Sequence, residues 1–155
     1  MAAKTNAMRL LDKDKIKYTV REYPEGPVAA VDVAKYFGQP ADRLFKTLVT
    51  TDNNHGYYVF CLPGDHELDL KKAAAIVGAK KIEMLKQKDL LKLTGYIHGG
   101  CSPIGMKKLF PTVVDVSALD WDTIYVSGGK IGLQIEIDPR VLEQVVYATF
   151  EQVTK

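Results

Sequence analysis

Cysteine is scarce in this sequence: the 155 residues include only Cys61 and Cys101. Two cysteines are too few for the disulfide framework that holds small secreted domains together. No pair of Cys-x-x-Cys motifs is present, which leaves a structural zinc site without support. The three histidines, His55, His66 and His98, are scattered along the chain, so we expect neither a metal site nor a cofactor.

Long hydrophobic runs are also absent. No stretch approaches the roughly 18 apolar residues that a membrane-spanning helix requires. The opening residues, Met-Ala-Ala-Lys-Thr, do not form the apolar run of a secretory signal. These absences indicate a soluble, reduced protein of the cytoplasm.

Neither sign of charge dominates. Lysine and arginine total 21 and aspartate and glutamate total 19, so the formal net charge is +2. A balance this close to neutral excludes binding of a polyanion by bulk charge alone. Contact with nucleic acid would therefore need a local patch or a shaped pocket.

The composition is that of a globular protein. Apolar residues make up 46% of the chain and charged residues 26%, which supplies enough apolar material for a core. The chain has no linker, low-complexity tract or internal repeat, and its length suits one domain. We therefore expect one domain over residues 1–155.

Turn and capping signals divide the chain into short elements. Apolar periodicity predicts helices at about 5–14, 31–38, 69–78, 87–93 and after Pro139. Strands are predicted at 16–23, 44–51, 56–63, 80–84, 112–116 and 123–137, the first ended by Pro24-Glu25-Gly26-Pro27. Because several strands form hairpins, we expect the α/β (α+β) class, with a mixed, partly barrel-like sheet flanked by helices rather than a doubly wound parallel sheet.

Lys46 is the residue whose chemistry most needs an explanation. Its strand, 44–49, carries apolar side chains on both faces, so we expect a central strand. A lysine there must be paired, desolvated or aimed into a cleft, because an unpaired buried ammonium is costly. In the alternative interpretation, Lys46 reaches the edge of the sheet or pairs with a carboxylate.

The C-terminal strands form a second candidate site. A two-residue turn at Gly128-Gly129 predicts a hairpin in which Val126 pairs with Ile131 and Ile124 with Leu133. The face opposite the core then carries Tyr125, Ser127, Lys130, Gly132 and Gln134. This face is either a pocket wall or a solvated surface on which an aromatic ring covers a strand glycine.

The glycine-rich segment 95–105 is too irregular to be a core element. Its backbone N–H groups could face an oxyanion or a phosphate. It matches neither the dinucleotide fingerprint nor the P-loop, so binding of a nucleoside triphosphate is not supported. His98 and Cys101 invite a thiol-protease or thioesterase interpretation, but no third group is identifiable, and Cys101 is better explained as a small apolar filler.

Lysines cluster at 71–72, 80–81, 86–92 and 107–108. Such clusters usually solvate an exposed face of a helix or loop. The alternative is a rim that contacts RNA phosphates, with charge only where it is useful.

Short motifs follow one another in a fixed order: Thr5-Asn6-Ala7, Phe45-Lys46-Thr47-Leu48, Leu68-Asp69-Leu70-Lys71-Lys72, Gly78-Ala79-Lys80-Lys81, Thr94-Gly95-Tyr96, Gly99-Gly100-Cys101-Ser102-Pro103-Ile104-Gly105 and Ile124-Tyr125-Val126-Ser127-Gly128-Gly129-Lys130. With these motifs, nearly the whole chain resembles the YbaK/EbsC family of Cys-tRNA(Pro) deacylases. That family is related to the editing domain inserted in bacterial prolyl-tRNA synthetases. Its fold is a mixed, partly barrel-like sheet with surrounding helices.

The resemblance implies a trans-editing enzyme that cleaves the ester between cysteine and the terminal adenosine of Cys-tRNA(Pro), with Cys-tRNA(Cys) as a further substrate. In the cysteine-specific branch the substrate thiol attacks its own carbonyl. Release of a thiolactone makes the reaction a lyase-type cleavage, and attack by water makes it a hydrolysis. The implied partners are the 3′ acceptor end of a mischarged tRNA and prolyl-tRNA synthetase, with no cofactor and no membrane.

The resemblance also assigns residues. Lys46 corresponds to the essential lysine of the family, and it would hold the terminal nucleotide or its phosphate. Gly99 and Gly100 belong to the loop whose amides would face the oxyanion. The residues expected to bind substrate are Tyr23, Thr47, Ser102, Ser127, Lys130 and Gln134.

Departures from the family pattern concern the expected pocket. This chain has Gln134 where some members have Asp, Ile131 where many have Arg, and Cys101 where an aliphatic residue is commoner. Ala29 or Ala30 stands near a position that some members fill with a bulky aromatic. Two alternatives stay open: editing of alanine or another small amino acid on tRNA(Pro), and a non-catalytic module that binds tRNA or a synthetase.

Overall fold

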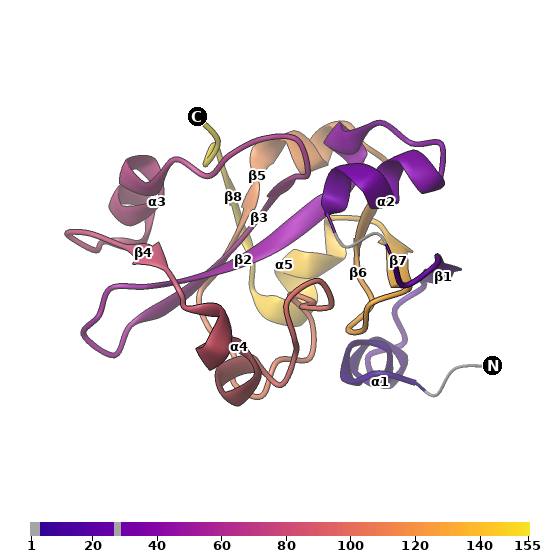
Figure 1. Cartoon of the computed structure of the whole chain (residues 1–155), viewed down its shortest axis with the longest axis horizontal. Coiled ribbons are helices and arrows are strands. Elements are labelled where there is room, and N and C mark those ends of the chain that lie inside the picture. Colours follow the sequence, from indigo (N-terminus) through magenta and orange to yellow (C-terminus); the bar gives the residue numbers. More distant parts are fainter. Residues whose placement is uncertain (1–3, 27–28) are drawn as a thin grey trace.

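The computed structural model describes residues 4–26 and 29–155 (Figure 1). The helices are α1 (Asn6–Lys13), α2 (Ala30–Tyr36), α3 (Leu70–Val77), α4 (Gln87–Thr94) and α5 (Val141–Val146), with the 3-10 helices η1 (Ala41–Arg43) and η2 (Val116–Asp120). The strands are β1 (Thr19–Glu22), β2 (Phe45–Thr51), β3 (Tyr57–Pro63), β4 (Glu83–Met84), β5 (Thr112–Asp115), β6 (Ile124–Ser127), β7 (Leu133–Ile137) and β8 (Thr149–Glu151).

In the described part of the chain the strands form two sheets, with the orders β4-β2-β3-β5-β8 and β1-β7-β6. The larger sheet is mixed, because β5 runs parallel to both β3 and β8 while the other pairs are antiparallel. The predicted mixed α+β class is therefore confirmed. The barrel-like part of the prediction is wrong, since neither of these sheets closes on itself.

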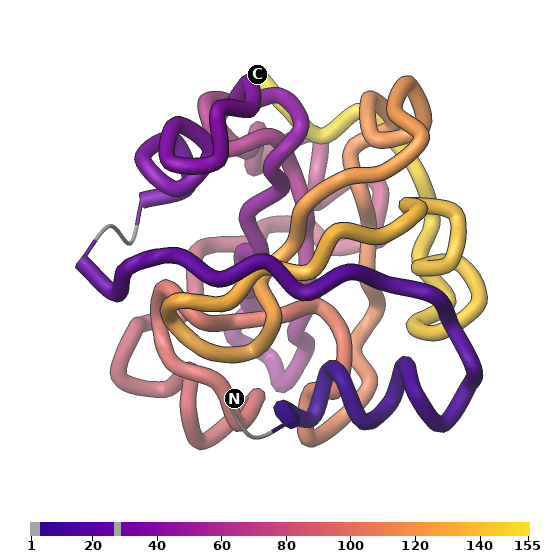
Figure 2. Tube along the Cα trace, turned by 90° about the vertical axis from the view of Figure 1, so that its right-hand side faces the viewer, coloured from indigo at the N-terminus to yellow at the C-terminus, as the bar shows by residue number. Residues whose placement is uncertain are grey.

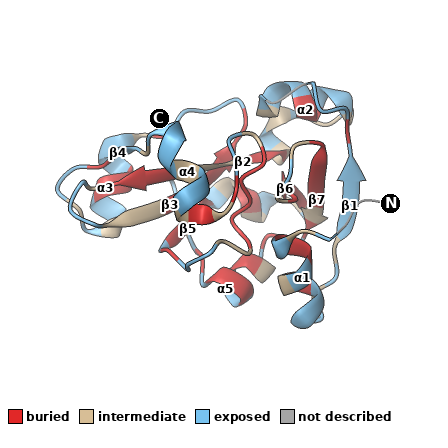
Figure 3. Ribbon diagram, turned by 60° about the horizontal axis from the view of Figure 1, so that its bottom comes forward, coloured by how far each residue is buried: buried red, intermediate tan, exposed pale blue. Residues whose placement is uncertain are grey.

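The main hydrophobic core lies between the two sheets, where Figure 3 shows buried residues on β2, β3, β5, β6 and β7. Side chains alternate along each strand, so one face of each sheet can be wholly apolar. The large sheet contributes Phe45, Val49, Val59, Cys61 and Val114, and the small sheet Ile124, Val126, Leu133, Ile135 and Ile137. Helices α1 and α5 complete this core with Leu11 and Leu142, both fully buried.

Helix α3 belongs to the core on the other face of the large sheet, where its Ala73 and Ala74 cluster with Phe60. It begins and ends as predicted. The Asp69 carboxylate accepts hydrogen bonds from the N–H groups of residues 71 and 72, and Gly78 ends the helix in the left-handed conformation.

Helix α2 covers a third, smaller cluster. Val33 and Ala34 are buried there beside Tyr23, Leu44 and Tyr125. Two large apolar residues of the same helix, Val31 and Tyr36, are exposed at 44% and 56%.

The C-terminal hairpin differs from the prediction in its register. Val126 pairs with Ile135, not with Ile131, so the connection runs from residue 128 to 132 and is not a two-residue turn. The predicted register is wrong by four residues. Because an even shift leaves every side chain on its face, the predicted core face is still correct.

Strand β2 has apolar contacts on both faces, as predicted, but it is central over only part of its length. It pairs with β3 throughout, whereas β4 pairs with it only at Thr50 and Thr51. Near the other end, Leu44 forms a single bridge to Tyr125 of β6. The edge between these two points is open to the pocket described below.

Strand β1 is shorter than the predicted 16–23 and is exposed along its length. It pairs antiparallel with β7 at the edge of the small sheet, and Figure 2 shows it at the surface of the molecule. Pro27 of the predicted break after this strand lies outside the described residues, as do residues 1–3 of the predicted domain. None of the described helices is both long and apolar enough to cross a membrane.

Candidate functional site

A pocket of about 390 Å³ lies along the open edge of β2. Five consecutive residues of this region, 44–48, line it from both faces of the strand. Helix α2 and the segment before it, the loop 98–101, helix α4 and the small sheet supply the other walls. The lining residues are Tyr23, Ala29, Ala30, Val31, Val33, Leu44, Phe45, Lys46, Thr47, Leu48, Gly64, Leu90, His98, Gly99, Cys101, Ser127 and Gln134.

The backbone of β2 contributes polar groups to this pocket. The carbonyl of Leu44 accepts from Gly64 on the β3 side, and the carbonyl of Val49 accepts from Leu85 on the opposite side. Backbone groups alternate between the two edges of a strand. The N–H and C=O of Thr47 are thus directed to the same edge as Val49, where no described strand pairs with them.

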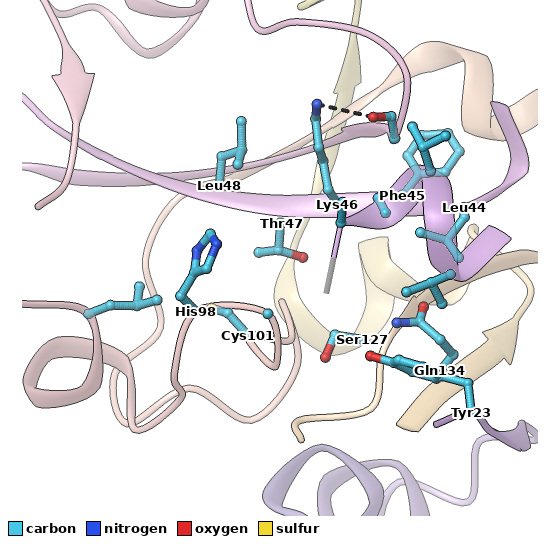
Figure 4. Close-up of a pocket in the computed structure, with 17 residues that line it drawn as sticks. Tyr23, Leu44, Phe45, Lys46, Thr47, Leu48, His98, Cys101, Ser127 and Gln134 are labelled. Carbon is cyan, nitrogen blue, oxygen red and sulfur yellow. Dashed lines mark hydrogen bonds between the residues drawn. The ribbon is translucent and has the colours of Figure 1, made fainter. Parts of the chain in front are cut away.

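Lys46 projects from one side of β2 and Thr47 from the other (Figure 4). The Lys46 ammonium donates to the carbonyl of Gly64 at 3.3 Å, and Nζ makes no other hydrogen bond to a described residue. Partial burial lowers the pKa of Lys46, and the nearby charges of Glu67 and Asp65 work in the opposite direction. The site thus holds a cation whose charge no ion pair neutralises within the described residues.

The Thr47 side of the pocket is weakly polar and contains sulfur atoms. The Thr47 hydroxyl lies 3.8 Å from the sulfur of Cys61, and Cys101 lines the same wall. Burial raises the pKa of both Cys61 and Cys101 to about 12. A thiol with such a pKa is almost never the thiolate that nucleophilic catalysis needs. The structure therefore supports the interpretation of Cys101 as a packing residue.

The small sheet provides the third wall. The hydroxyl of Tyr23 and the side chain of Ser127 project into the same part of the pocket (Figure 4). Gln134 stands beside them with 5% of its surface exposed, and its Oε1 has no hydrogen-bond partner among the described residues. A buried amide oxygen without a partner among the described residues is costly, so this oxygen is available to accept a hydrogen bond from a bound ligand.

The loop 95–105 is held rigidly although it has no regular structure. The Tyr96 hydroxyl donates to the carbonyl of Ile104 at 2.6 Å. A Cβ added at Gly105 would lie 2.8 Å from the backbone of α1, and one added at Gly100 would lie 2.9 Å from the N atom of Ile131. Only glycine permits these two contacts, so the loop position depends on α1 and on the hairpin loop 128–132.

Three predicted site residues do not line the pocket. Gly100 packs against the backbone of residues 130–131, and its N–H donates to Ile97 at 3.0 Å. Ser102 is fully buried and accepts from the N–H of Ile104, so its hydroxyl shapes the loop. Lys130 is exposed on the neighbouring hairpin loop. Of the two predicted glycines, Gly99 is the one that faces the pocket.

The pocket also contains residues that are not among the predicted site residues, chiefly Gly64, Leu90 and His98. The hairpin register pairs Phe45 with Pro63, so extending the predicted hairpin by one residue would have placed Gly64 opposite Leu44. The sequence links His98 only to Cys101, although it directly precedes the predicted Gly99. Leu90 comes from a helix that no local pattern joins to β2, so no sequence signal could have found it.

The geometry combines one unneutralised ammonium, free backbone groups, an unpaired amide and small side chains. Among the described lining residues none is an activated nucleophile: the Cys101 thiol is deeply buried, and neither the Thr47 nor the Ser127 hydroxyl is hydrogen-bonded to a base. Such a site can bind an anionic or ester-bearing ligand and stabilise charge on an oxygen.

Comparisons with known proteins point to one family. The model of the aminoacyl-tRNA editing domain matches residues 25–145. The chain is 47% identical to EbsC of Enterococcus faecalis, whose name gives it Cys-tRNA(Pro)/Cys-tRNA(Cys) deacylase activity, over 97% of this chain and 93% of EbsC. It is 33% identical to a proline–tRNA ligase of Elusimicrobium minutum, over 65% of this chain but 18% of the ligase.

Two solved structures share the fold. One, described as a trans-editing enzyme for prolyl-tRNA synthetase, has a TM-score of 0.86 and 24% identity, and the match covers 99% of both chains. The other, a hypothetical protein, has a TM-score of 0.90 and 22% identity, over 97% of this chain and all of its own.

Proposed function

Since this chain belongs to the family of aminoacyl-tRNA editing domains, we propose that it is a trans-acting deacylase. Its substrate is Cys-tRNA(Pro), with Cys-tRNA(Cys) as a second one, and it removes the cysteine by cleaving the ester at the terminal adenosine. The similarity to EbsC over nearly the full length of both proteins supports this substrate choice.

One observation supports the proposal: among the described residues, the pocket combines an ammonium that has no ion-pair partner with the absence of an activated nucleophile. Lys46 supplies the positive charge, and the only lining thiol has a pKa of about 12. An enzyme with these groups positions the substrate and stabilises the charge that develops on the carbonyl oxygen, while the substrate provides the attacking atom.

The reaction balances without a further reactant. The substrate sulfur attacks its own carbonyl, a C–S bond forms, and the C–O bond to the ribose breaks. The thiol proton goes to the leaving ribose oxygen, so the products are deacylated tRNA and a cysteine thiolactone. If water attacks instead, the product is free cysteine and the enzyme is a hydrolase.

The residues of the pocket have different roles in this reaction. Lys46 holds the terminal nucleotide or its phosphate, and the Gly99 backbone faces the carbonyl oxygen. Thr47, Ser127, Tyr23 and Gln134 bind the aminoacyl group. Gly100 and Ser102 keep the loop in place from behind.

A deacylation panel tests the proposal. The protein is incubated with tRNA(Pro) charged with cysteine, alanine or proline, and the charged fraction is followed with time. We expect acceleration for cysteine and none for proline. Faster deacylation of Ala-tRNA(Pro) than of Cys-tRNA(Pro) would show that alanine, not cysteine, is the amino acid removed. No acceleration at micromolar protein would contradict the deacylase proposal and favour a non-catalytic binding module.

Prolyl-tRNA synthetase is the proposed partner, because the family is shared with a segment of proline–tRNA ligases. A small protein of nearly neutral charge attracts tRNA only weakly. Association with a synthetase that selects tRNA(Pro) raises its effective concentration at that tRNA. Titration of labelled protein with the synthetase, with and without tRNA(Pro), tests this association.

A further inference from the structure

The two sides of the pocket differ in charge. The chain has no acidic residue between Asp89 and Asp115, a stretch that includes the loop 95–105, Lys92 and Lys107. Across β2, the turn that supplies Gly64 continues directly into Asp65 and Glu67. Figure 4 shows the carbonyl bonded to Lys46 and the His98–Cys101 loop on opposite sides of this strand.

Three lysines flank the two ends of the loop. The ammonium of Lys107 donates to the carbonyl of Lys92 at 3.5 Å, and the stem of Lys107 covers Gly95. At the other end of the loop, Gly100 packs on the backbone of Lys130. Lys92, Lys107 and Lys130 are all exposed, and we call these three residues the basic face.

The opposite side is acidic. Asp42 of η1 lies with Asp65 and His66 so that their polar atoms are within 4.8 Å of one another. Glu67 follows in the same turn, and it contacts Lys155 at 3.2 Å. All of these side chains are exposed, and we call Asp42, Asp65 and Glu67 the acidic turn.

This polarity restricts how an RNA reaches the pocket. Every nucleotide brings a phosphate, and a net charge of +2 provides no general attraction for it. Phosphates near the acidic turn meet like charge, whereas phosphates near the basic face release counterions.

We propose that the acceptor stem of an RNA lies along the basic face when its 3′ end occupies the pocket, so that only the terminal nucleotide, held by Lys46, comes close to the acidic turn. This inference rests on the proposed function for the identity of the ligand in the pocket. It adds the direction of approach, and it gives Lys130, which does not line the pocket, a role in contacting phosphates.

Binding of an uncharged RNA tests the inference without any chemistry. The probe is a fluorescein-labelled acceptor-stem hairpin ending in CCA, titrated by anisotropy at several salt concentrations. The test variant is Lys92→Gln with Lys107→Gln, in which the Cγ and Cδ atoms of the glutamine at position 107 still cover Gly95. The matched control is Lys80→Gln with Lys81→Gln, which removes the same charge between α3 and β4, away from the pocket lining.

We expect the test variant to bind about tenfold more weakly at about 0.1 M salt, with a salt slope shallower by about two, and the control to bind as the wild type does. Equal effects in both variants, or none in either, would overturn the inference.

A second readout separates this inference from the proposed function. Deacylation of full-length Cys-tRNA(Pro) should fall in the test variant, while deacylation of a cysteinyl CCA trinucleotide, which has no stem, stays unchanged. Loss on both substrates would assign the lysines to the pocket and contradict the inference. If the wild type deacylates neither substrate but binds the hairpin through the basic face, the proposed function fails and the direction of approach stands.

Discussion

Lys46 and Gly64 are tied by a hydrogen bond of 3.3 Å from the ammonium to the backbone carbonyl. A Cβ added at Gly64 would lie 2.7 Å from the Cβ of Ala30, so the same glycine lets the first turn of α2 close on the pocket. A carbonyl orients the ammonium without cancelling its charge. The bond therefore prepares Lys46 for an anion, at the point where α2 meets the edge of β2.

Replacing Lys46 with alanine should abolish deacylation while the fold persists. Removing one preorganised charge from a site of this kind costs on the order of 10² to 10³ in rate. The measurement is kcat/KM on Cys-tRNA(Pro), with circular dichroism for the fold. Lys35→Ala on α2 is the control for a lost surface charge, because Lys35 is exposed and does not line the pocket. An active Lys46→Ala enzyme would refute the site assignment.

Gln134→Leu should make the protein more stable and less active. The substitution removes a buried amide oxygen that has no partner in the described part of the chain, which is worth about 1 kcal/mol, or a Tm higher by about 2–4 °C. The same amide is proposed to bind substrate, so kcat/KM should fall. Gln144→Leu on the exposed side of α5 should change neither quantity. A loss of stability in Gln134→Leu would mean that the amide already has a structural partner.

Cys101→Ser should keep deacylase activity. Because burial raises the pKa of the Cys101 thiol to about 12, iodoacetamide should also react with it slowly in the native protein at neutral pH. The two tests are residual kcat/KM and the rate of alkylation, followed by mass spectrometry with and without denaturant. Rapid alkylation that inactivates the enzyme would instead favour a thioesterase.

Gly100→Ala should displace the pocket loop. The new methyl group would lie 2.9 Å from the N atom of Ile131, and overpacking against backbone costs about 1–3 kcal/mol. We expect a lower Tm and a larger fractional loss of kcat. Gly26→Ala is the matched control, since nothing lies within 4 Å of its added Cβ. If both variants behave as the wild type does, the contact between loop and hairpin is not what positions Gly99.

Glu136→Gln should change the dependence of stability on pH. The Thr123 hydroxyl, followed by Arg21 and Arg43, lowers the pKa of Glu136 below its ordinary 4.5. A carboxyl with a lowered pKa stabilises the folded state above its unfolded pKa, and this contribution is lost as the pH falls through the folded value.

The Tm difference between wild type and Glu136→Gln should therefore be full near neutral pH and shrink below about pH 4.5. Glu143→Gln, at an exposed position on α5, is the control. A difference that stays constant from pH 7 to pH 3 would show that the ion pairs of Glu136 contribute nothing.

Local signals predicted most of the elements, because they depend on neighbours in sequence. Asp69 and Gly78 delimit α3 as the capping rules require, and the segments 44–51 and 56–63 pair as a hairpin. The predicted register of the C-terminal hairpin is wrong, because Gly128-Gly129 resembles a two-residue turn. In the structure the connection is a longer loop that packs against Gly100 and Tyr96. No local pattern contains that constraint.

The candidate site likewise contains residues that local sequence predicts and residues that it cannot predict. Lys46 could be singled out because a lysine in a strand with two apolar faces is anomalous. Gly99 and Ser102 share one motif, yet one faces the pocket and the other is buried behind it, and only the conformation of the loop separates them. His98 and Leu90 reach the pocket through packing of segments that are distant in sequence from β2.

The pocket exists because two neighbours of β2 stop short of each other: β4 pairs only at Thr50 and Thr51, and β6 bridges only at Leu44. The length of the binding site is therefore set by strand lengths, at positions that never touch a ligand. Two more paired residues after Met84 would fill the site with main chain, and loss of the β4 pairing would enlarge it. Insertions and deletions around residues 85–86 are thus a route by which substrate size can evolve while every side chain of the site stays the same.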